Sequence, residues 1–287
     1  LEFYGDKGYE HWDAATHAAH QLTIKLKEAR QPVDILKLHA SDGYMFNHIH
    51  LSTAWINLGK RVRGGAKRPD DRRLEPLREQ TLAMVPELEE QAVANTVYGM
   101  ARAGVGRGPR GAKLWTKLAE HALELHGRPA STHGIRPVLA YSGPQVSRPF
   151  KPIDIANLVL GFATAGHKAP ALFDALAEKS RERLDEFNEQ NIANVAWAYA
   201  TVGHCAPSLF EAIAASAQGR VHELNGQDIA NVALASATAG HSAPSLYRAS
   251  AASGKRGDHG RHRHSIDNEA GAYATAGRPA PSQDQAL

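Results

Sequence analysis

The hydrophobic positions of residues 150–252 follow helical spacings. One apolar set has the spacing i, i+3, i+4, i+7 and comprises Ile192, Val195, Ala196 and Tyr199. A second set has the spacing i, i+1, i+4, i+5 and comprises Leu209, Phe210, Ile213 and Ala214. Each spacing places its residues on one face of a helix. Gly203 and Pro207 lie between the sets, where they favour the end of one helix and the start of the next. The pattern therefore predicts a hairpin of two helices.

The same pattern returns along the chain. The tripeptide Ile-Ala-Asn begins at residues 155, 192 and 229 and decays to Ile-Asp-Asn at 266, so each step is 37 residues (192 − 155, 229 − 192, 266 − 229). A glycine follows at 166, 203, 240 and 277, and a proline at 170, 207, 244 and 281. A lone hairpin cannot bury its apolar faces, whereas stacked hairpins bury them against each other. The repeat therefore predicts an all-α fold, a right-handed α-solenoid of stacked helical hairpins with a 37-residue unit.

Weaker copies of the unit predict the remaining organisation. Residues 1–45 are expected to hold entry helices, over 13–29 and 33–40. Residues 46–126 are expected to form degenerate repeats, with helices after Phe46, near 72–84, from Glu90 and over 113–125. Residues 127–148 contain three prolines and three glycines, which predicts an inserted loop at 127–149. Residues 150–252 form the regular repeats, and 253–287 a degenerate, frayed last repeat.

Composition narrows the class of protein. The hydrophobic fraction is 43%, so most of the 287 residues should surround a core, and no apolar run is long enough for a membrane-spanning helix. The single cysteine, Cys205, excludes an internal disulfide. Because the chain starts at Leu1 rather than Met, we treat it as a fragment or processed form. Seven basic residues lie from Lys60 to Arg73 against two aspartates. Such a stretch is typical of a nucleic-acid contact, and equally of a solvated loop.

Two regions of the chain, 187–213 and 33–54, carry a family resemblance. Residues 187–204 read Phe-Asn-Glu-Gln-Asn-Ile-Ala-Asn-Val-Ala-Trp-Ala-Tyr-Ala-Thr-Val-Gly-His, followed at 206–213 by Ala-Pro-Ser-Leu-Phe-Glu-Ala-Ile. They resemble heptatricopeptide and octotricopeptide repeat proteins. Residues 33–38 (Val-Asp-Ile-Leu-Lys-Leu) and 46–54 (Phe-Asn-His-Ile-His-Leu-Ser-Thr-Ala) resemble the helical region of FAST-kinase-type proteins. The C-terminal RAP domain that many of these proteins carry has no counterpart in the chain.

The resemblance implies a function in an organelle. These families bind organellar transcripts and support RNA processing, stability, ribosomal RNA maturation or translation. The expected location is the mitochondrial matrix, with the chloroplast as the alternative. The expected partners are single-stranded RNA and other components of a ribonucleoprotein.

Each first helix carries a distinct face at the spacing i, i+4, i+7, i+11. The hypothesis is that this face lines a concave groove, where amides hydrogen-bond base edges, aromatic rings stack on bases and cations pair with phosphates. The candidate RNA-binding residues are Lys60, Asn95, Tyr98, Arg102, Gln190, Asn194, Trp197, Thr201, Gln227 and Asn231. An interhelical hydrogen-bond ladder is the alternative explanation for the recurring Asn157, Asn194 and Asn231, and a core position is the alternative for Trp197.

Three classes of function follow from these patterns. RNA binding is the expectation, without catalytic residues, metal, cofactor, small-molecule substrate or membrane contact. A protein-binding α-solenoid scaffold is the alternative, because residues 150–223 are slightly acidic and repeat architecture alone does not determine the ligand. An enzyme would need a site that the sequence does not reveal.

Overall fold

The computed structural model describes residues 14–105, 109–128, 149–220, 226–238 and 240, and these residues contain helices and no strand. The N-terminal helices are α1 (Ala14–Glu28), α2 (Pro32–Asp42), α3 (His48–Arg63), α4 (Asp71–Met84), α5 (Glu90–Arg102) and α6 (Pro109–His126). The helices of the regular repeats are α7 (Pro152–Ala165), α8 (Pro170–Glu182), α9 (Glu189–Val202), α10 (Pro207–Gly219) and α11 (Gly226–Thr238). Short 3-10 turns at 43–45, 85–87 and 184–186 connect successive hairpins.

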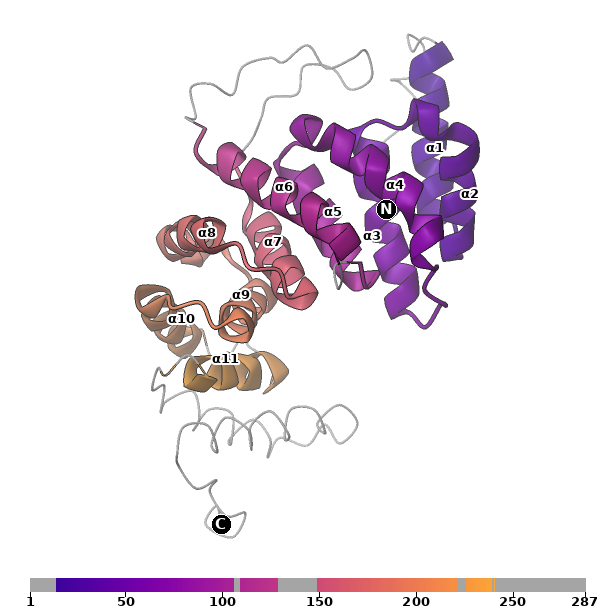
Figure 1. The fold of residues 1–287 in the computed structure, drawn as a ribbon. Coiled ribbons are helices and arrows are strands. Elements are labelled where there is room, and N and C mark those ends of the chain that lie inside the picture. Colours follow the sequence, from indigo (N-terminus) through magenta and orange to yellow (C-terminus); the bar gives the residue numbers. More distant parts are fainter. Residues whose placement is uncertain (1–13, 106–108, 129–148, 221–225, 239, 241–287) are drawn as a thin grey trace, which may run out of the picture.

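The helices form two rows along a curved path (Figure 1). The odd-numbered helices make one row, in which α3, α5, α7, α9 and α11 pack each on the next. The even-numbered helices cover this row and contact each other much less. An array that is packed more closely in one row bends toward that row, so the odd-numbered helices form its inner side. The described residues are therefore a solenoid-like stack of helical hairpins.

Glycines bring the backbones of α3, α5 and α7 into contact. A Cβ atom on Gly99 would lie 2.4 Å from the carbonyl carbon and oxygen of Trp55 in α3. A Cβ atom on Gly161 would lie 2.6 Å from Val97 Cγ1 in α5, and one on Gly59 would lie 2.6 Å from the Gly99 carbonyl oxygen. Such separations are too short for real Cβ atoms. The close packing of the inner row at these helices therefore requires glycine.

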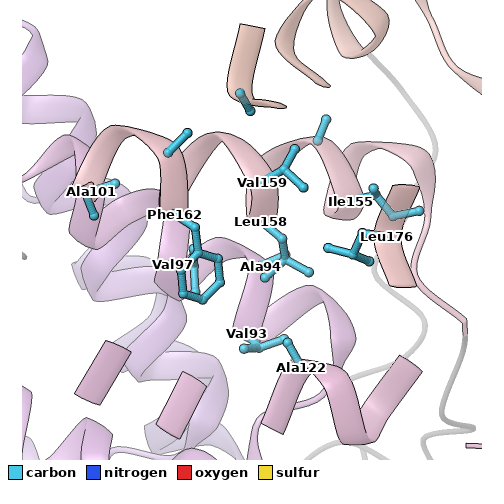
Figure 2. Packing of buried hydrophobic residues seen from close by; sticks show 14 of the residues in the cluster. Val93, Ala94, Val97, Ala101, Ala122, Ile155, Leu158, Val159, Phe162 and Leu176 are labelled. Carbon is cyan, nitrogen blue, oxygen red and sulfur yellow. The ribbon is translucent and has the colours of Figure 1, made fainter. Parts of the chain in front are cut away.

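The expected hairpin signals act as predicted. Gly166 and Gly203 end α7 and α9 in the left-handed conformation, with φ of 69° and 65°. Pro170 and Pro207 occupy the first position of α8 and α10. Asn188 caps α9, because its side chain accepts the Asn191 backbone N–H at 2.8 Å. The core between the rows is apolar, as Figure 2 shows for α5, α7 and their covering helices.

Three of the described hairpins are also tied at their base by a polar side chain. Arg183, at the end of α8, donates to the Phe150 carbonyl at 2.7 Å, and Arg220, at the end of α10, donates to the Phe187 carbonyl at 2.7 Å. His121 of α6 makes the equivalent contact with the Leu88 carbonyl at 2.7 Å. These carbonyls precede α7, α9 and α5, so each second helix holds the entrance of its own first helix.

Most of the expected helices are confirmed, with one correction. The entry hairpin is α1 and α2, and α3, α4 and α5 begin within two residues of the expected positions. The expected helix at 113–125 is wrong at its start, since α6 begins at Pro109. Proline suits the first turn of a helix because its missing N–H has no partner there, and the glycines around it obscured this start. None of the described helices is long and apolar enough to span a bilayer. The predicted insertion, apart from its ends, and the predicted last repeat lie outside the described residues.

Candidate nucleic-acid interface

The exposed face of the inner row coincides with the candidate residues. In α5, every residue from Ala92 to Ala101 is buried except Asn95 and Tyr98. In α9, every residue from Asn191 to Tyr199 is buried except Asn194 and Trp197, while Gln190 and Thr201 lie at its two ends and are not buried. These are the i, i+4, i+7 and i+11 positions of each helix. They lie away from the covering helices, on the open side of the row.

The neighbouring helices repeat this arrangement. In α7, Asn157 and Leu160 are half-buried within an otherwise buried run, and Ile153 and Thr164 are exposed. In α3, Thr53 and Ile56 are half-buried and Lys60 is exposed. Asn231 of α11 is half-buried, whereas the side chain of Gln227 lies outside the described residues. We define these positions of α3, α5, α7 and α9 as the inner stripe.

The N-terminal part of the inner stripe forms the floor of a groove of about 660 Å³. The groove lies between α1, α3 and α5. Its lining combines three kinds of side chain: the cations Lys27, Lys60 and Arg61, amides that include Asn57, Gln91 and Asn95, and the apolar Ile49 and Ile56. Glu89 is the acidic residue of the lining. The groove is therefore net positive, with hydrogen-bonding and apolar groups on its floor.

Tyr98 and Arg102 contact each other, which the sequence pattern did not predict. The Arg102 guanidinium lies over the Tyr98 ring, 4.7 Å from its centroid, and donates a hydrogen bond to the Tyr98 hydroxyl. Burial, together with the nearby charge of Arg63, lowers the pKa of Arg102. Arg102 Nε is buried and has no partner among the described residues. The pair forms one flat, cationic surface, instead of the separate stacking and phosphate groups that the sequence suggested.

Part of the basic stretch from Lys60 to Arg73 is used to hold the fold. Arg61 donates to the Ala29 carbonyl at 3.0 Å. Arg68 donates to the Ala103 carbonyl at 2.9 Å and to Asp71 at 2.8 Å, and Arg73 lies 3.7 Å from Asp70. The exposed Lys60 takes part in no ion pair among the described residues. The cationic character of the groove therefore comes from a few positions of this stretch and from Lys27.

Within the part of the chain that the structure describes, three amides of the inner stripe take no part in holding the helices together. The side chains of Asn95, Asn157 and Asn194 make no hydrogen bond to any described residue. This geometry does not support the interhelical ladder for these residues. Asn231 has a partner. Trp197 is half-buried and packs against the core, so its ring is both part of the packing and partly open to a ligand.

Two buried histidines of α3 lie at the groove: His48 lines it, and His50 connects α3 to α1 beside it. His50 Nδ1 accepts the Asn47 backbone N–H at 3.1 Å, so its proton is on Nε2, which donates to the Ala19 carbonyl at 2.9 Å. Burial lowers the pKa of His50, and burial together with His50 lowers the pKa of His48, which lines the groove. Both are therefore neutral near pH 7. Sequence reasoning missed these histidines because they lie outside the i, i+4, i+7 and i+11 positions of α3, and it missed Lys27 because α1 does not carry the repeat pattern.

Other chemically active residues lie apart from the inner stripe. His167 stacks on Trp115, and His204 packs on Phe173 and Tyr199 and contacts Asp174 at 2.8 Å. These ring contacts indicate that both histidines help to pack the hairpin turns. Cys205 is exposed and unpaired. Within the described ranges, no group of three or more His, Cys, Asp or Glu side chains is placed to hold a metal ion.

Comparison with known proteins adds a family similarity. Residues 138–247 match the model of a family described as RNA-editing substrate-binding complex 6 protein. The match covers the regular repeats, from before α7 to beyond α11. No curated protein matches the chain. The chain is thus a helical, repeat-like protein whose regular part is similar to a family named for RNA editing. The resemblance to heptatricopeptide, octotricopeptide and FAST-kinase-type proteins stays a prediction.

Proposed function

We propose that this protein binds single-stranded RNA along the inner stripe, and that it acts in organellar RNA processing by binding rather than by catalysis. The observation that carries the proposal is the inner stripe itself. Four consecutive helices of the inner row leave the same positions open. These positions hold aromatic rings, cations and amides that make no hydrogen bond among the described residues, and at α3 and α5 they adjoin a net positive groove. The family similarity of residues 138–247 supports an RNA-associated role.

The side chains fit the chemistry of unpaired RNA. The amides of Asn95, Asn157, Gln190 and Asn194 can donate to and accept from the Watson–Crick edges of bases, which are free only when RNA is single-stranded. Trp197 and the Tyr98–Arg102 pair offer flat surfaces on which bases stack. Lys60 offers a charge for a phosphate. Because these groups follow one curved row, an extended strand would meet them in succession.

Architecture and location are parts of the same proposal. We propose a right-handed α-solenoid with a 37-residue unit, and the starts of equivalent helices at Pro152, Glu189 and Gly226 support the unit length. We further propose that the protein works in mitochondria, with the chloroplast as the alternative compartment, as a component of a ribonucleoprotein. This role extends to RNA stability, ribosomal RNA maturation or translation as well as editing.

The proposal is tested by fluorescence-polarisation binding of this chain to a pool of labelled single-stranded RNA at two salt concentrations. Lys60→Ala and Trp197→Ala should weaken binding. The control variants are Lys117→Ala, which removes an exposed lysine from the covering row, and Tyr44→Ala, which removes an aromatic side chain that is 85% exposed outside the groove. A folded chain that binds no RNA at either salt concentration refutes the proposal and favours the protein-binding scaffold.

A further inference from the structure

The inner stripe changes character along its length. At its N-terminal end, on α3 and α5, the stripe carries Lys60 and Arg102, and the adjoining groove adds the cations Lys27 of α1 and Arg61 of α3. Its C-terminal end, at α7 and α9, carries only uncharged side chains: Ile153, Asn157, Leu160, Thr164, Gln190, Asn194, Trp197 and Thr201. We propose that the two ends recognise one RNA strand differently: the N-terminal end binds its phosphates in addition to its bases, and the C-terminal end binds its bases alone. This inference rests on the proposed function.

The N-terminal end is suited to a phosphate backbone. Lys27 and Lys60 are exposed and come from different helices, α1 and α3, that line the same groove. The guanidinium of Arg61 donates a hydrogen bond to the Ala29 carbonyl, which fixes a third positive charge at the groove. A strand that lies between these cations replaces its counterions with them, and its affinity should fall steeply with salt.

The C-terminal end is suited to bases and poorly suited to phosphates. The carboxylate of Asp154 is buried and accepts the Lys151 backbone N–H at 3.0 Å, and Glu189 is paired with Arg220 at 2.5 Å. Both acids are thus held by partners outside the stripe. The eight positions of the stripe in α7 and α9 include no cation, so this end offers no charge to a phosphate. Ile153 is 46% exposed, and Leu160 and Trp197 are half-buried beside the unused amides. Apolar surfaces of this kind gain free energy when they are covered by the face of a base.

The two ends therefore predict two different responses to salt. The double variant Lys27→Ala/Lys60→Ala should reduce the slope of log affinity against log salt by about 1.4, which is roughly 0.7 for each phosphate of a single strand that is no longer neutralised by a lysine. Trp197→Ala should weaken binding about 5- to 150-fold at every salt concentration, with an unchanged slope, because stacking releases no counterion. Lys117→Ala, on the covering row, should change neither quantity.

A second ligand isolates the bases. An RNA of equal length with a central abasic tract keeps its phosphates and loses its stacking surfaces. The wild-type chain should bind it more weakly than the intact RNA, and Trp197→Ala should show a smaller preference for the intact RNA than the wild type does. The division is supported if the lysine substitutions reduce the slope of log affinity against log salt and the Trp197 substitution reduces the preference for the intact RNA.

The outcomes separate the two proposals. If the wild-type chain binds RNA, but Trp197→Ala lowers the salt slope or keeps the full preference for the intact strand, the division is refuted while RNA binding stands. If Trp197→Ala binds RNA as the wild type does, the division is also refuted, and a protein partner becomes the expected ligand of the C-terminal end of the stripe. If the folded wild-type chain binds no RNA, both proposals fail.

Discussion

Replacing Gly99 by alanine tests the close packing on which the inner stripe depends. The added Cβ atom would lie 2.4 Å from the Trp55 carbonyl group and 2.6 Å from the Ile56 nitrogen, whereas ordinary contacts begin at 3.4 Å. Helices α3 and α5 would thus have to separate by up to 1.0 Å (3.4 − 2.4). Overpacking of this kind costs about 1–3 kcal/mol. Since each kcal/mol lowers the melting temperature by roughly 2–4 °C in chains of 150–250 residues, we expect a loss of about 2–12 °C.

Urea and thermal unfolding followed by circular dichroism measure this loss. Gly219→Ala is the matched control, because a Cβ atom on Gly219 at the end of α10 meets nothing within 4 Å. That substitution should be neutral or stabilise by about 0.4–1 kcal/mol, since alanine has less conformational freedom in the unfolded chain. Ile56 lines the groove, so RNA affinity should also fall in Gly99→Ala. A Gly99→Ala variant as stable as the wild type would show that the inner row is not packed as described.

Three further predictions concern the hairpin ties, the buried histidine and the stacked pair. Arg220→Ala should lower the free energy of unfolding in urea by about 1–3 kcal/mol, because the Phe187 carbonyl and Glu189 lose their partner. Arg181→Ala, from an exposed pair with Glu178, should lower it far less, because solvent screens such pairs; equal losses would contradict the tie. Burial lowers the pKa of His50 below 6.5, so the unfolded chain binds a proton at this residue more readily than the folded chain does. The free energy of unfolding should therefore be highest above pH 6.5 and fall as the pH drops below 6.5. In His50→Gln this fall should be smaller, and an unchanged pH dependence would refute a buried, neutral His50. Tyr98→Phe should keep the stacking surface and most of the RNA affinity, whereas Tyr98→Ala should weaken binding by about 1–3 kcal/mol in fluorescence polarisation; equal losses would show that the hydroxyl, not the ring, matters.

The sequence predicted the local structure of the regular repeats well, because that structure depends on near neighbours. Gly203 and Pro207 fix the hairpin turn through their own backbone preferences, and Asn188 caps α9 through a contact three residues away. The exposed face also followed from periodicity, since burial of the stripe that contains Ile192 and Tyr199 leaves Asn194 and Trp197 on the opposite side.

Contacts between distant residues were not predictable in the same way. The groove includes Lys27, whose helix lacks the repeat pattern, and no spacing in the sequence places it in one groove with Lys60. The ties from Arg183 and Arg220 join residues 33 apart, and two arginines 37 residues apart are a weak signal when the chain holds 33 basic residues. The pairing of Tyr98 with Arg102 is local, at i and i+4, and could have been proposed from that spacing.

The glycines of the inner row also limit which helices of the array are interchangeable. Gly99 of α5 and Gly161 of α7 correspond to Ala198 of α9 and Ala235 of α11, each four residues after the recurring asparagine. At Gly99 and Gly161 the neighbouring helix leaves no room for a Cβ atom, whereas the Cβ atoms of Ala198 and Ala235 are accommodated in the core. A regular unit with alanine at this position therefore could not replace α5 or α7 without displacing the neighbouring helix.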